Sequence, residues 1–193
     1  MERDYGALPI NELGVGAGFR RPTQRQATHV TLASPALDVM TDLTRVNPAT
    51  IRPQAPLAGA NQFMITRGVR LLLVIDDLEN VLGVITATDI LGERPMLSAT
   101  ERGLRRDELT VADVMTGAGL VEVLSLADAE GARVGHIVAT LRRAGRQHAL
   151  VADRGNTVCG IFSISQIARQ LGVALPAAGE VARTFAEIGS AIK

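Results

Sequence analysis

Apolar residues along this chain form short aliphatic runs and stripes with helical spacing, in an order that recurs. Residues 71–75 and 81–85 are aliphatic and flank a polar turn, which predicts a β-hairpin. A helix is expected before the hairpin, because apolar residues at helical spacing lie between Pro56 and Gly68. These residues are Leu57, Ala60 and Met64. A short strand at residues 50–52 is expected to precede this helix.

The second half of the chain has the same order of elements. Residues 149–152 and 157–162 predict two strands around a polar turn, and helices are expected before Gly145 and before Gly172. The stripe of the first helix is Val134, Ile137, Val138 and Leu141, and that of the second is Ile164, Ile167, Ala168 and Leu171. Since a short helix is also expected after Thr86, both halves have the order strand, helix, strand, strand, helix.

Two short sequences recur in the same order in both halves. Asp-Val-Met-Thr occurs at residues 38–41 and again at residues 113–116. Residues 83–90, which begin Gly-Val-Ile-Thr, correspond to residues 160–167, which begin Gly-Ile-Phe-Ser. A unit of about sixty residues buries too little surface to be stable alone. We therefore expect an α/β fold in which two tandem β-α-β-β-α units pack together with pseudo-two-fold symmetry.

The repeat divides the chain into five segments. Ser34 and Pro35 are expected to begin the first unit with a short helix that leads to Met40, and Gly92 and Pro95 to end its last helix. Charged residues dominate the region between the units, which predicts a solvated linker. The segments are an N-terminal lead at residues 1–33, the first unit at 34–96, the linker at 97–109, the second unit at 110–172 and an amphipathic C-terminal helix at 173–193.

The predicted C-terminal helix carries one apolar stripe, made of Val181, Phe185, Ile188 and Ile192. Water does not solvate such a stripe well, so another surface must cover it. That surface belongs either to the chain's own module or to a partner.

Composition and charge exclude several classes of function. The 193 residues include 20 basic residues (Lys and Arg) and 20 acidic residues (Asp and Glu), so the net charge is zero. A nucleic-acid-binding surface, which needs an excess of positive charge, is therefore not expected. Cys159 is the one cysteine, which excludes an internal disulfide, and the three dispersed histidines provide no metal-ligand spacing. The longest aliphatic run, residues 71–75, is too short to cross a membrane. We expect a soluble, cytoplasmic protein.

The recurring sequences resemble a known family. Residues 73–76, Leu-Val-Ile-Asp, followed by a turn and by Gly-Val-Ile-Thr-x-x-Asp at residues 83–89, are similar to a CBS motif. Two such motifs in tandem, over residues 34–172, resemble a Bateman module. The resemblance implies a regulatory homodimer that binds AMP, ADP, ATP or S-adenosylmethionine in the cleft between the motifs. It implies a sensor of an adenine nucleotide that acts on another protein, rather than an enzyme.

Thr86 and Asp89 are the first candidate ligand-binding residues. A threonine at the start of a helix presents its hydroxyl beside unpaired backbone N–H groups, which favour phosphate or ribose oxygens. The Asp89 carboxylate, one turn later, can accept hydrogen bonds from ribose hydroxyls. The same spacing also matches a capping box, which would satisfy the helix N-terminus without a ligand. Both interpretations remain open.

The second unit differs at the corresponding positions, which are Ser163 and Gln166. This pair also matches a capping box. Gln166 has a neutral amide where the family has a carboxylate, so it offers one acceptor oxygen and no charge. The second site therefore binds a nucleotide poorly or takes a different ligand.

The resemblance implies further ligand contacts from residues on both units. A basic residue before the second strand often contacts phosphate, which corresponds to Arg70 in the first unit and to Arg146 or His148 in the second. The alternatives are a solvated arginine at Arg70 and a hydrogen-bonded histidine at a sheet edge at His148. The stretch that contacts adenine in the family corresponds to Thr44 and Ala49.

Three hypotheses follow for the function. The first is a tandem CBS protein that binds an adenine nucleotide and regulates an unidentified protein in trans. The second is a ligand-free dimerisation or scaffolding module, in which the capping boxes are purely structural. The third is a small α/β enzyme, which the sequence supports least, because no nucleophile elbow, P-loop or acid–base pair is recognisable.

Overall fold

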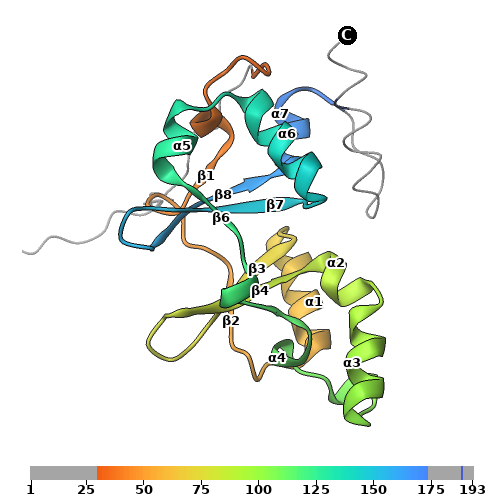
Figure 1. Ribbon diagram of the computed structural model, residues 1–193. Coiled ribbons are helices and arrows are strands. Elements are labelled where there is room, and N and C mark those ends of the chain that lie inside the picture. Colours follow the sequence, from red (N-terminus) through yellow and green to blue (C-terminus); the bar gives the residue numbers. More distant parts are fainter. Residues whose placement is uncertain (1–29, 174–187, 189–193) are drawn as a thin grey trace, which may run out of the picture.

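Two four-stranded sheets organise the chain in the computed structural model, which describes residues 30–173 and residue 188. The strand order is β2-β3-β4-β5 in one sheet and β1-β8-β7-β6 in the other. Helices cover the outer side of each sheet, and the two sheets face each other at the middle of the molecule (Figure 1). The predicted α/β class with two repeated units is confirmed.

The first body is built around the first hairpin, and the second body around the second hairpin. The first contains β2 (Thr50–Ile51), α1 (Leu57–Arg67), β3 (Leu71–Ile75), β4 (Val81–Thr86), α2 (Ala87–Leu91), α3 (Arg94–Arg102), η2 (Arg106–Glu108), α4 (Val111–Val114), β5 (Thr116–Gly117) and η3 (Ala118–Leu120). The second contains η1 (Ala36–Val39), β1 (Thr41–Asp42), β6 (Val123–Ser125), α5 (Leu126–Gly131), α6 (Val134–Ala144), β7 (His148–Ala152), β8 (Val158–Ser163) and α7 (Ile164–Gln170).

Local sequence accounts for most of these elements. The helices α1 and α6 end at Gly68 and Gly145, whose φ values of 65° and 62° are the left-handed conformation that glycine adopts without strain. The predicted apolar stripe of α1 is buried, and so is most of the stripe of α6. Both hairpins are antiparallel and have a register shift near the turn, so the two units repeat each other in detail.

Two expectations about local structure were wrong. The predicted short helix before β1 forms as a 3-10 helix, but Ser34 does not cap it, because its hydroxyl accepts a hydrogen bond from the Thr31 N–H instead. The last helix of the first unit was expected to end at Gly92 and Pro95, but a further helix, α3, begins at Arg94 and extends into the predicted linker at residues 97–109. Pro95 lies in the first turn of α3, where its missing N–H costs nothing, so this proline belongs to a helix start and not to an end.

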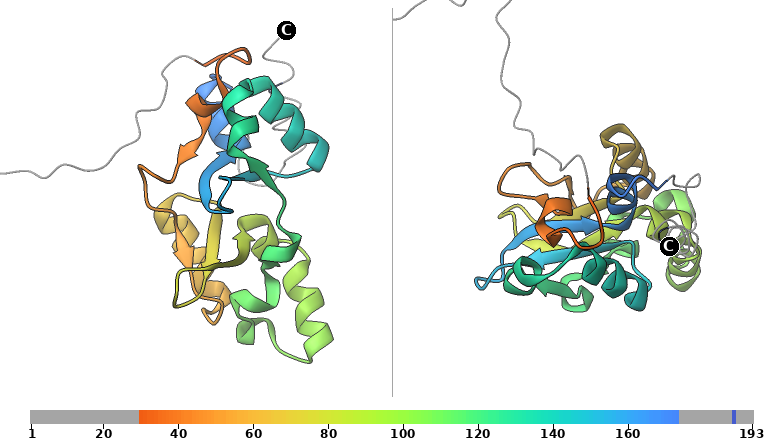
Figure 2. Two further views of the ribbon diagram at one scale, coloured as in Figure 1. Left: turned by 60° about the vertical axis from the view of Figure 1, so that its left-hand side comes forward. Right: turned by 90° about the horizontal axis from the view of Figure 1, so that it is seen from above.

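Each repeat supplies the edge strand of the other repeat's sheet. The second copy of Asp-Val-Met-Thr places β5 beside β4, where Thr116 pairs with Val84. The first copy places β1 beside β8, where Thr41 pairs with Ile161. Figure 2 shows the orange entry segment in the body formed by the teal and blue residues, and the first green helices in the body formed by the yellow residues. The two repeats are therefore joined by a reciprocal exchange.

Three apolar cores result from this exchange. The first helical core includes Val111 and Val114 from the second repeat, and the second helical core includes Ala36 and Val39 from the first. Ile188 is buried in this second core, whereas the other residues of the predicted C-terminal stripe lie outside the described residues. The third core lies between the sheets, and its buried members are Leu71, Leu73, Val84 and Leu150.

A glycine permits the close approach of β5 to β4. A Cβ atom at Gly83 would overlap the backbone carbonyl oxygen of Thr116, which cannot move without breaking the strand pairing. At the equivalent Gly160, the nearest atoms belong to the flexible side chain of Met40. The contact of β5 with β4 at Gly83 is thus between two backbones. At Gly160, the side chain of Met40 can move to relieve a close contact.

We expect Gly83→Ala to lower the free energy of unfolding by about 2 kcal/mol or more, because the added methyl group must displace β5. Gly59→Ala is a matched control in an exposed turn of α1, where nothing lies within 4 Å of the added atom. It should stabilise the protein by about 0.5–1 kcal/mol through helix propensity. Urea unfolding measures both values, and a Gly83→Ala protein as stable as the wild type would contradict the close approach.

Candidate functional site

A cleft of about 270 Å³ lies between the two repeats, next to the exchanged strand β5. Its walls come from the end of β4, the start of α2, the β7 edge and the segment that joins β5 to β6. Four of the residues singled out from the sequence lie near this cleft. Thr86, Asp89, Arg146 and His148 line it, together with Leu71, Val84, Thr88, Thr116, Val121, Glu122, Gly145, Gln147 and Leu150.

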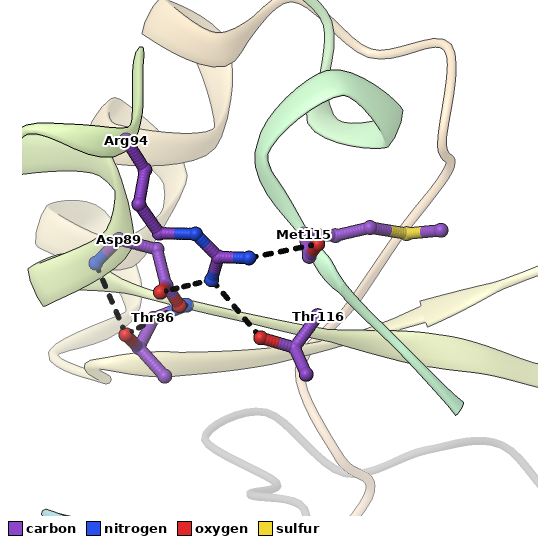
Figure 3. Close-up of polar contacts among 5 residues, drawn as sticks. All are labelled: Thr86, Asp89, Arg94, Met115 and Thr116. Atoms are coloured by element: carbon purple, nitrogen blue, oxygen red, sulfur yellow. Dashed lines mark hydrogen bonds and ion pairs between the residues drawn. The ribbon is translucent and has the colours of Figure 1, made fainter. Parts of the chain in front are cut away.

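Thr86 and Asp89 form the capping box that their spacing predicts (Figure 3). The backbone N–H of Thr86 donates to Asp89 Oδ2 at 2.9 Å, and the Thr86 hydroxyl donates to the same oxygen at 2.7 Å. The backbone N–H of Asp89 in turn donates to the Thr86 hydroxyl at 3.2 Å. Both side chains are half-buried at the start of α2. The backbone N–H groups of Thr86 and Asp89 at the start of this short helix therefore have hydrogen-bond partners within the chain.

Arg94, the first residue of α3, contacts the other oxygen of the Asp89 carboxylate. Its Nη1 atom lies 2.6 Å from Asp89 Oδ1 and donates to the Thr116 hydroxyl at 3.0 Å. Its Nη2 atom donates to the Met115 carbonyl at 3.5 Å, as Figure 3 shows. We call this set of contacts among Arg94, Asp89, Met115 and Thr116 the Arg94 bridge. It joins the predicted site residue Asp89 to the start of β5, the strand of the second repeat that belongs to the first body.

The second copy of the motif has a different arrangement. Ser163 starts α7 without a side-chain cap, and its hydroxyl lies 2.9 Å from that of Ser165. Gln166 Oε1 accepts a hydrogen bond from the Thr41 hydroxyl at 3.2 Å. The predicted capping box of Ser163 and Gln166 is therefore wrong, because the neutral amide contacts the exchanged strand β1 directly. Neither Ser163 nor Gln166 lines the cleft around Asp89.

Arg70 and His148 lie near Asp89 on opposite repeats. The Arg70 side chain is half-buried, and among the described residues no hydrogen bond or ion pair engages its guanidinium. Burial lowers the pKa of His148 to about 4. The positive charge of Arg70 lowers this pKa further, and the negative charge of Asp89 raises it. His148 is therefore neutral at pH 7. Its Nδ1 atom is buried without a hydrogen-bond partner in the described part of the chain.

The other residues that the family resemblance implied are placed differently. Arg146 lies 3.1 Å from Glu122 in an exposed ion pair at the mouth of the cleft. Thr44 is exposed, and its hydroxyl donates to Asp42 Oδ1 at 2.6 Å, which lowers the pKa of that aspartate. Ala49 packs against the first helical core. Neither Thr44 nor Ala49 lines the cleft around Asp89, so the structure does not bring the whole predicted set together.

A larger cavity, of about 910 Å³, was not anticipated from the sequence. It opens between the turns of the two hairpins and is lined by equivalent residues of both repeats. Leu73 and Leu150 form its floor on the two sheets, and Glu79 and Asn156 lie at its rim. No sequence motif marks it, because its walls are common aliphatic residues of the strands. Glu79 is the sole charged residue on its described walls.

Other chemistries have little support within residues 30–173. No group of three or more His, Cys, Asp or Glu residues could hold a metal ion in this part of the chain. None of its helices has the length and apolar character needed to cross a bilayer. Cys159 packs against the second helical core, where burial raises the pKa of its thiol. This cysteine therefore has the character of a small apolar residue, as its sequence context predicts.

The burial of His148 predicts a pH-dependent stability. Its folded-state pKa of about 4 is below the ordinary 6.5, so between these values the unfolded chain binds more protons than the folded protein. The free energy of unfolding should be highest above pH 6.5 and fall by about 3 kcal/mol as the pH decreases to 4. Urea unfolding across this range measures the slope. His148→Gln, which does not titrate, should have a flatter profile, and equal slopes would contradict a buried neutral histidine.

Comparison with known proteins identifies the fold and a CBS-domain match in the first repeat. A model of the CBS domain matches residues 36–95. No curated protein matches the chain. An uncharacterized conserved protein from Pyrococcus horikoshii, known from a crystal structure, is 21% identical, with a TM-score of 0.56 over 77% of this chain and 100% of its own.

Two further solved structures contain adenosine compounds. The CBS-pair protein CBSX2 from Arabidopsis thaliana, solved in complex with AMP, is 20% identical, with a TM-score of 0.53 over 70% of this chain and 94% of its own. The CBS domain pair of protein MJ0100 was solved with 5'-methylthioadenosine and S-adenosyl-L-methionine. It is 21% identical, with a TM-score of 0.51 over 74% of this chain and 97% of its own. The CBS-domain model thus matches the first repeat, and both repeats together form the fold of the solved CBS-pair proteins.

Proposed function

We propose that this CBS pair binds an adenosine-containing ligand in the cleft around Asp89 and thereby regulates another protein. The observation that carries the proposal is the position of Thr86 and Asp89, which lie at a helix start and face His148 of the other repeat across one cleft. CBSX2 with AMP and MJ0100 with S-adenosyl-L-methionine support this ligand class, because both share the fold. AMP, ADP, ATP and S-adenosylmethionine are the candidates.

The chemistry of the cleft suits the parts of a nucleotide. Aliphatic side chains of Leu71, Val121 and Leu150 offer an apolar surface to an adenine ring. The Asp89 carboxylate is the acceptor for ribose hydroxyls, and such charge-assisted hydrogen bonds are stronger than neutral ones. Arg70 does not line the cleft, but its charge acts on His148, which does, and its guanidinium has no hydrogen bond or ion pair among the described residues, so we assign it the positive charge for a phosphate group.

Regulation would follow from a ligand that contacts both repeats. A bound ligand favours the arrangement of the two bodies that it binds more tightly, by as much as its affinities for the alternative arrangements differ. In this proposal the protein is a homodimer that transmits the change to a regulated protein in trans. Its role is regulatory and not catalytic, in keeping with the family.

A ligand-free scaffold is the second candidate function. One observation favours it, since the capping box and Arg94 already satisfy both oxygens of Asp89. In that case the geometry of the motif would serve only the stability of α2 and α3. The two candidates differ in whether any nucleotide stabilises the protein.

Thermal melts with AMP, ADP, ATP, S-adenosylmethionine and NAD distinguish the two functions. A true ligand at about one hundred times its Kd should stabilise the folded protein by about 2.7 kcal/mol, because it binds the folded state alone. Inorganic phosphate at equal ionic strength is the control for non-specific anion effects. An unchanged melting temperature with the whole panel would favour the scaffold.

Asp89→Ala tests the site itself. We expect it to weaken AMP binding about tenfold or more, because a charge-assisted hydrogen bond is lost, while Gln166→Ala has a smaller effect. Asp113→Ala is a matched control. Asp113 caps α4 through Thr110 and pairs with Arg102 at 2.7 Å, yet it does not line the cleft.

Isothermal titration calorimetry measures the three affinities, and urea unfolding measures the stability lost with each cap. Asp113→Ala should destabilise the protein and leave the affinity for AMP unchanged. A larger loss of affinity in Gln166→Ala than in Asp89→Ala would move the primary site to the second repeat.

A further inference from the structure

The Arg94 bridge connects the candidate ligand site to the exchanged strand. We propose that Arg94 controls access to Asp89: the bridge must open for a ribose to bind, and its opening removes the contacts through which Arg94 holds β5. This inference rests on the proposed function for the identity of the ligand. The bridge and its link to β5 are contacts within the chain and do not depend on that identity.

The acceptor capacity of Asp89 is nearly used up by contacts within the chain. A carboxylate oxygen accepts about two hydrogen bonds. Oδ2 already accepts from the N–H and the hydroxyl of Thr86, and Oδ1 accepts from Arg94. One acceptor position remains on Oδ1, whereas the two neighbouring hydroxyls of a ribose need two. The ribose and Arg94 therefore compete for the same oxygen.

The size of the cleft leads to the same conclusion. Its volume of about 270 Å³ is at the lower limit of ligand sites, which are about 300–1,000 Å³. The Asp89 and Thr116 side chains line this cleft, and Arg94 holds them together. Withdrawal of the half-exposed Arg94 side chain toward solvent would free both groups and widen the cleft between them.

The second repeat lacks the corresponding bridge. Leu171 takes the place of Arg94, counted from the glutamine that corresponds to Asp89, and it packs against the second helical core. There the Thr41 hydroxyl donates to Gln166 without an intervening cation. Arginine thus accompanies the carboxylate in the first repeat, and leucine accompanies the amide in the second. The difference indicates that the cation is specific to the first site.

The bridge also holds a weakly paired strand. β5 has two residues and pairs with β4 at Gly83 and Val84. Arg94 adds contacts to the Met115 carbonyl and the Thr116 hydroxyl at the start of this strand. When Arg94 leaves, β5 keeps its backbone pairing and loses these side-chain contacts. Ligand binding would therefore loosen the exchange between the repeats, which is a direct route from the site to the arrangement of the two bodies.

Arg94→Leu, which introduces the residue of the second repeat, tests the proposal. We expect it to bind AMP about fivefold more tightly than the wild type. The wild type must break the ion pair between Arg94 and Asp89 when AMP binds, whereas the variant has no such pair to break. Amide hydrogen exchange at residues 115–117 should be faster in ligand-free Arg94→Leu than in the ligand-free wild type. AMP should speed the same exchange in the wild type.

Arg102→Leu is the matched control, because Arg102 lies at the other end of α3 and pairs with Asp113 in an equivalent capping box. It should leave the affinity for AMP within about twofold of the wild type. Arg94→Gln provides a second variant should Arg94→Leu fold poorly, since it keeps a polar side chain and removes the charge. Both calorimetry and hydrogen exchange apply to it in the same way.

The outcomes separate this proposal from the proposed function. Weaker or equal AMP affinity in both Arg94 variants would overturn the competition between Arg94 and the ribose. If neither the wild type nor a variant binds AMP or S-adenosylmethionine, the ligand assignment fails. The hydrogen exchange of the ligand-free proteins then still decides whether Arg94 holds β5, and unchanged exchange at residues 115–117 would overturn that link as well.

Discussion

Backbone pairing between β5 and β4 is the contact on which the arrangement of this molecule depends. It brings Thr116 beside Gly83 so closely that the strand leaves no space for a side chain there. The same segment inserts Val111 and Val114 into the first helical core, and the connection that follows carries Val121 into the cleft. Without this pairing, the first body would lose an edge strand and part of its core, and the candidate site would lose one wall.

The two repeats are nearly equivalent in backbone and differ in the charge of their motifs. In the first, an arginine forms an ion pair with the aspartate and donates a hydrogen bond to a threonine from the other repeat. In the second, a glutamine contacts the equivalent threonine directly. A buried or half-buried charge must be paired, whereas a neutral amide needs a hydrogen bond alone. The two equivalent positions of the pseudo-symmetric fold therefore have different electrostatic requirements.

Much of this fold could be predicted from the sequence, because helices and hairpins leave periodic patterns. The strands β3 and β7, the helices α1 and α6 and the glycines that end them agree with the pattern of apolar residues. The reciprocal exchange could not be predicted, since strands of two residues such as β1 and β5 have no periodicity. The start of α3 was also missed, because Pro95 comes three residues after Gly92, and a glycine followed closely by a proline is typical of a helix end as well.

The candidate site was predicted in part for a similar reason. The spacing of Thr86 and Asp89 is local, and it correctly indicates a capping box. The contact of Asp89 with Arg94 depends on how α3 turns back toward β5, which no spacing in the sequence reports. The cap of Ser163 was wrong because Gln166 has a partner on β1, and that strand is distant in the sequence. Tertiary contacts thus explain the two features that the sequence did not predict correctly, the Arg94 contact and the missing cap of Ser163.

The reciprocal exchange also affects how the chain can fold. β1 near the beginning of the described chain pairs with β8 near its end, so the second sheet closes a loop that spans both repeats. Closing long loops costs entropy before the contacts are gained, and such topologies fold slowly. During synthesis, the first hairpin would emerge while the strand that completes its sheet is still missing. Neither repeat contains all the strands of its own sheet, because the first sheet needs β5 from the second repeat and the second sheet needs β1 from the first.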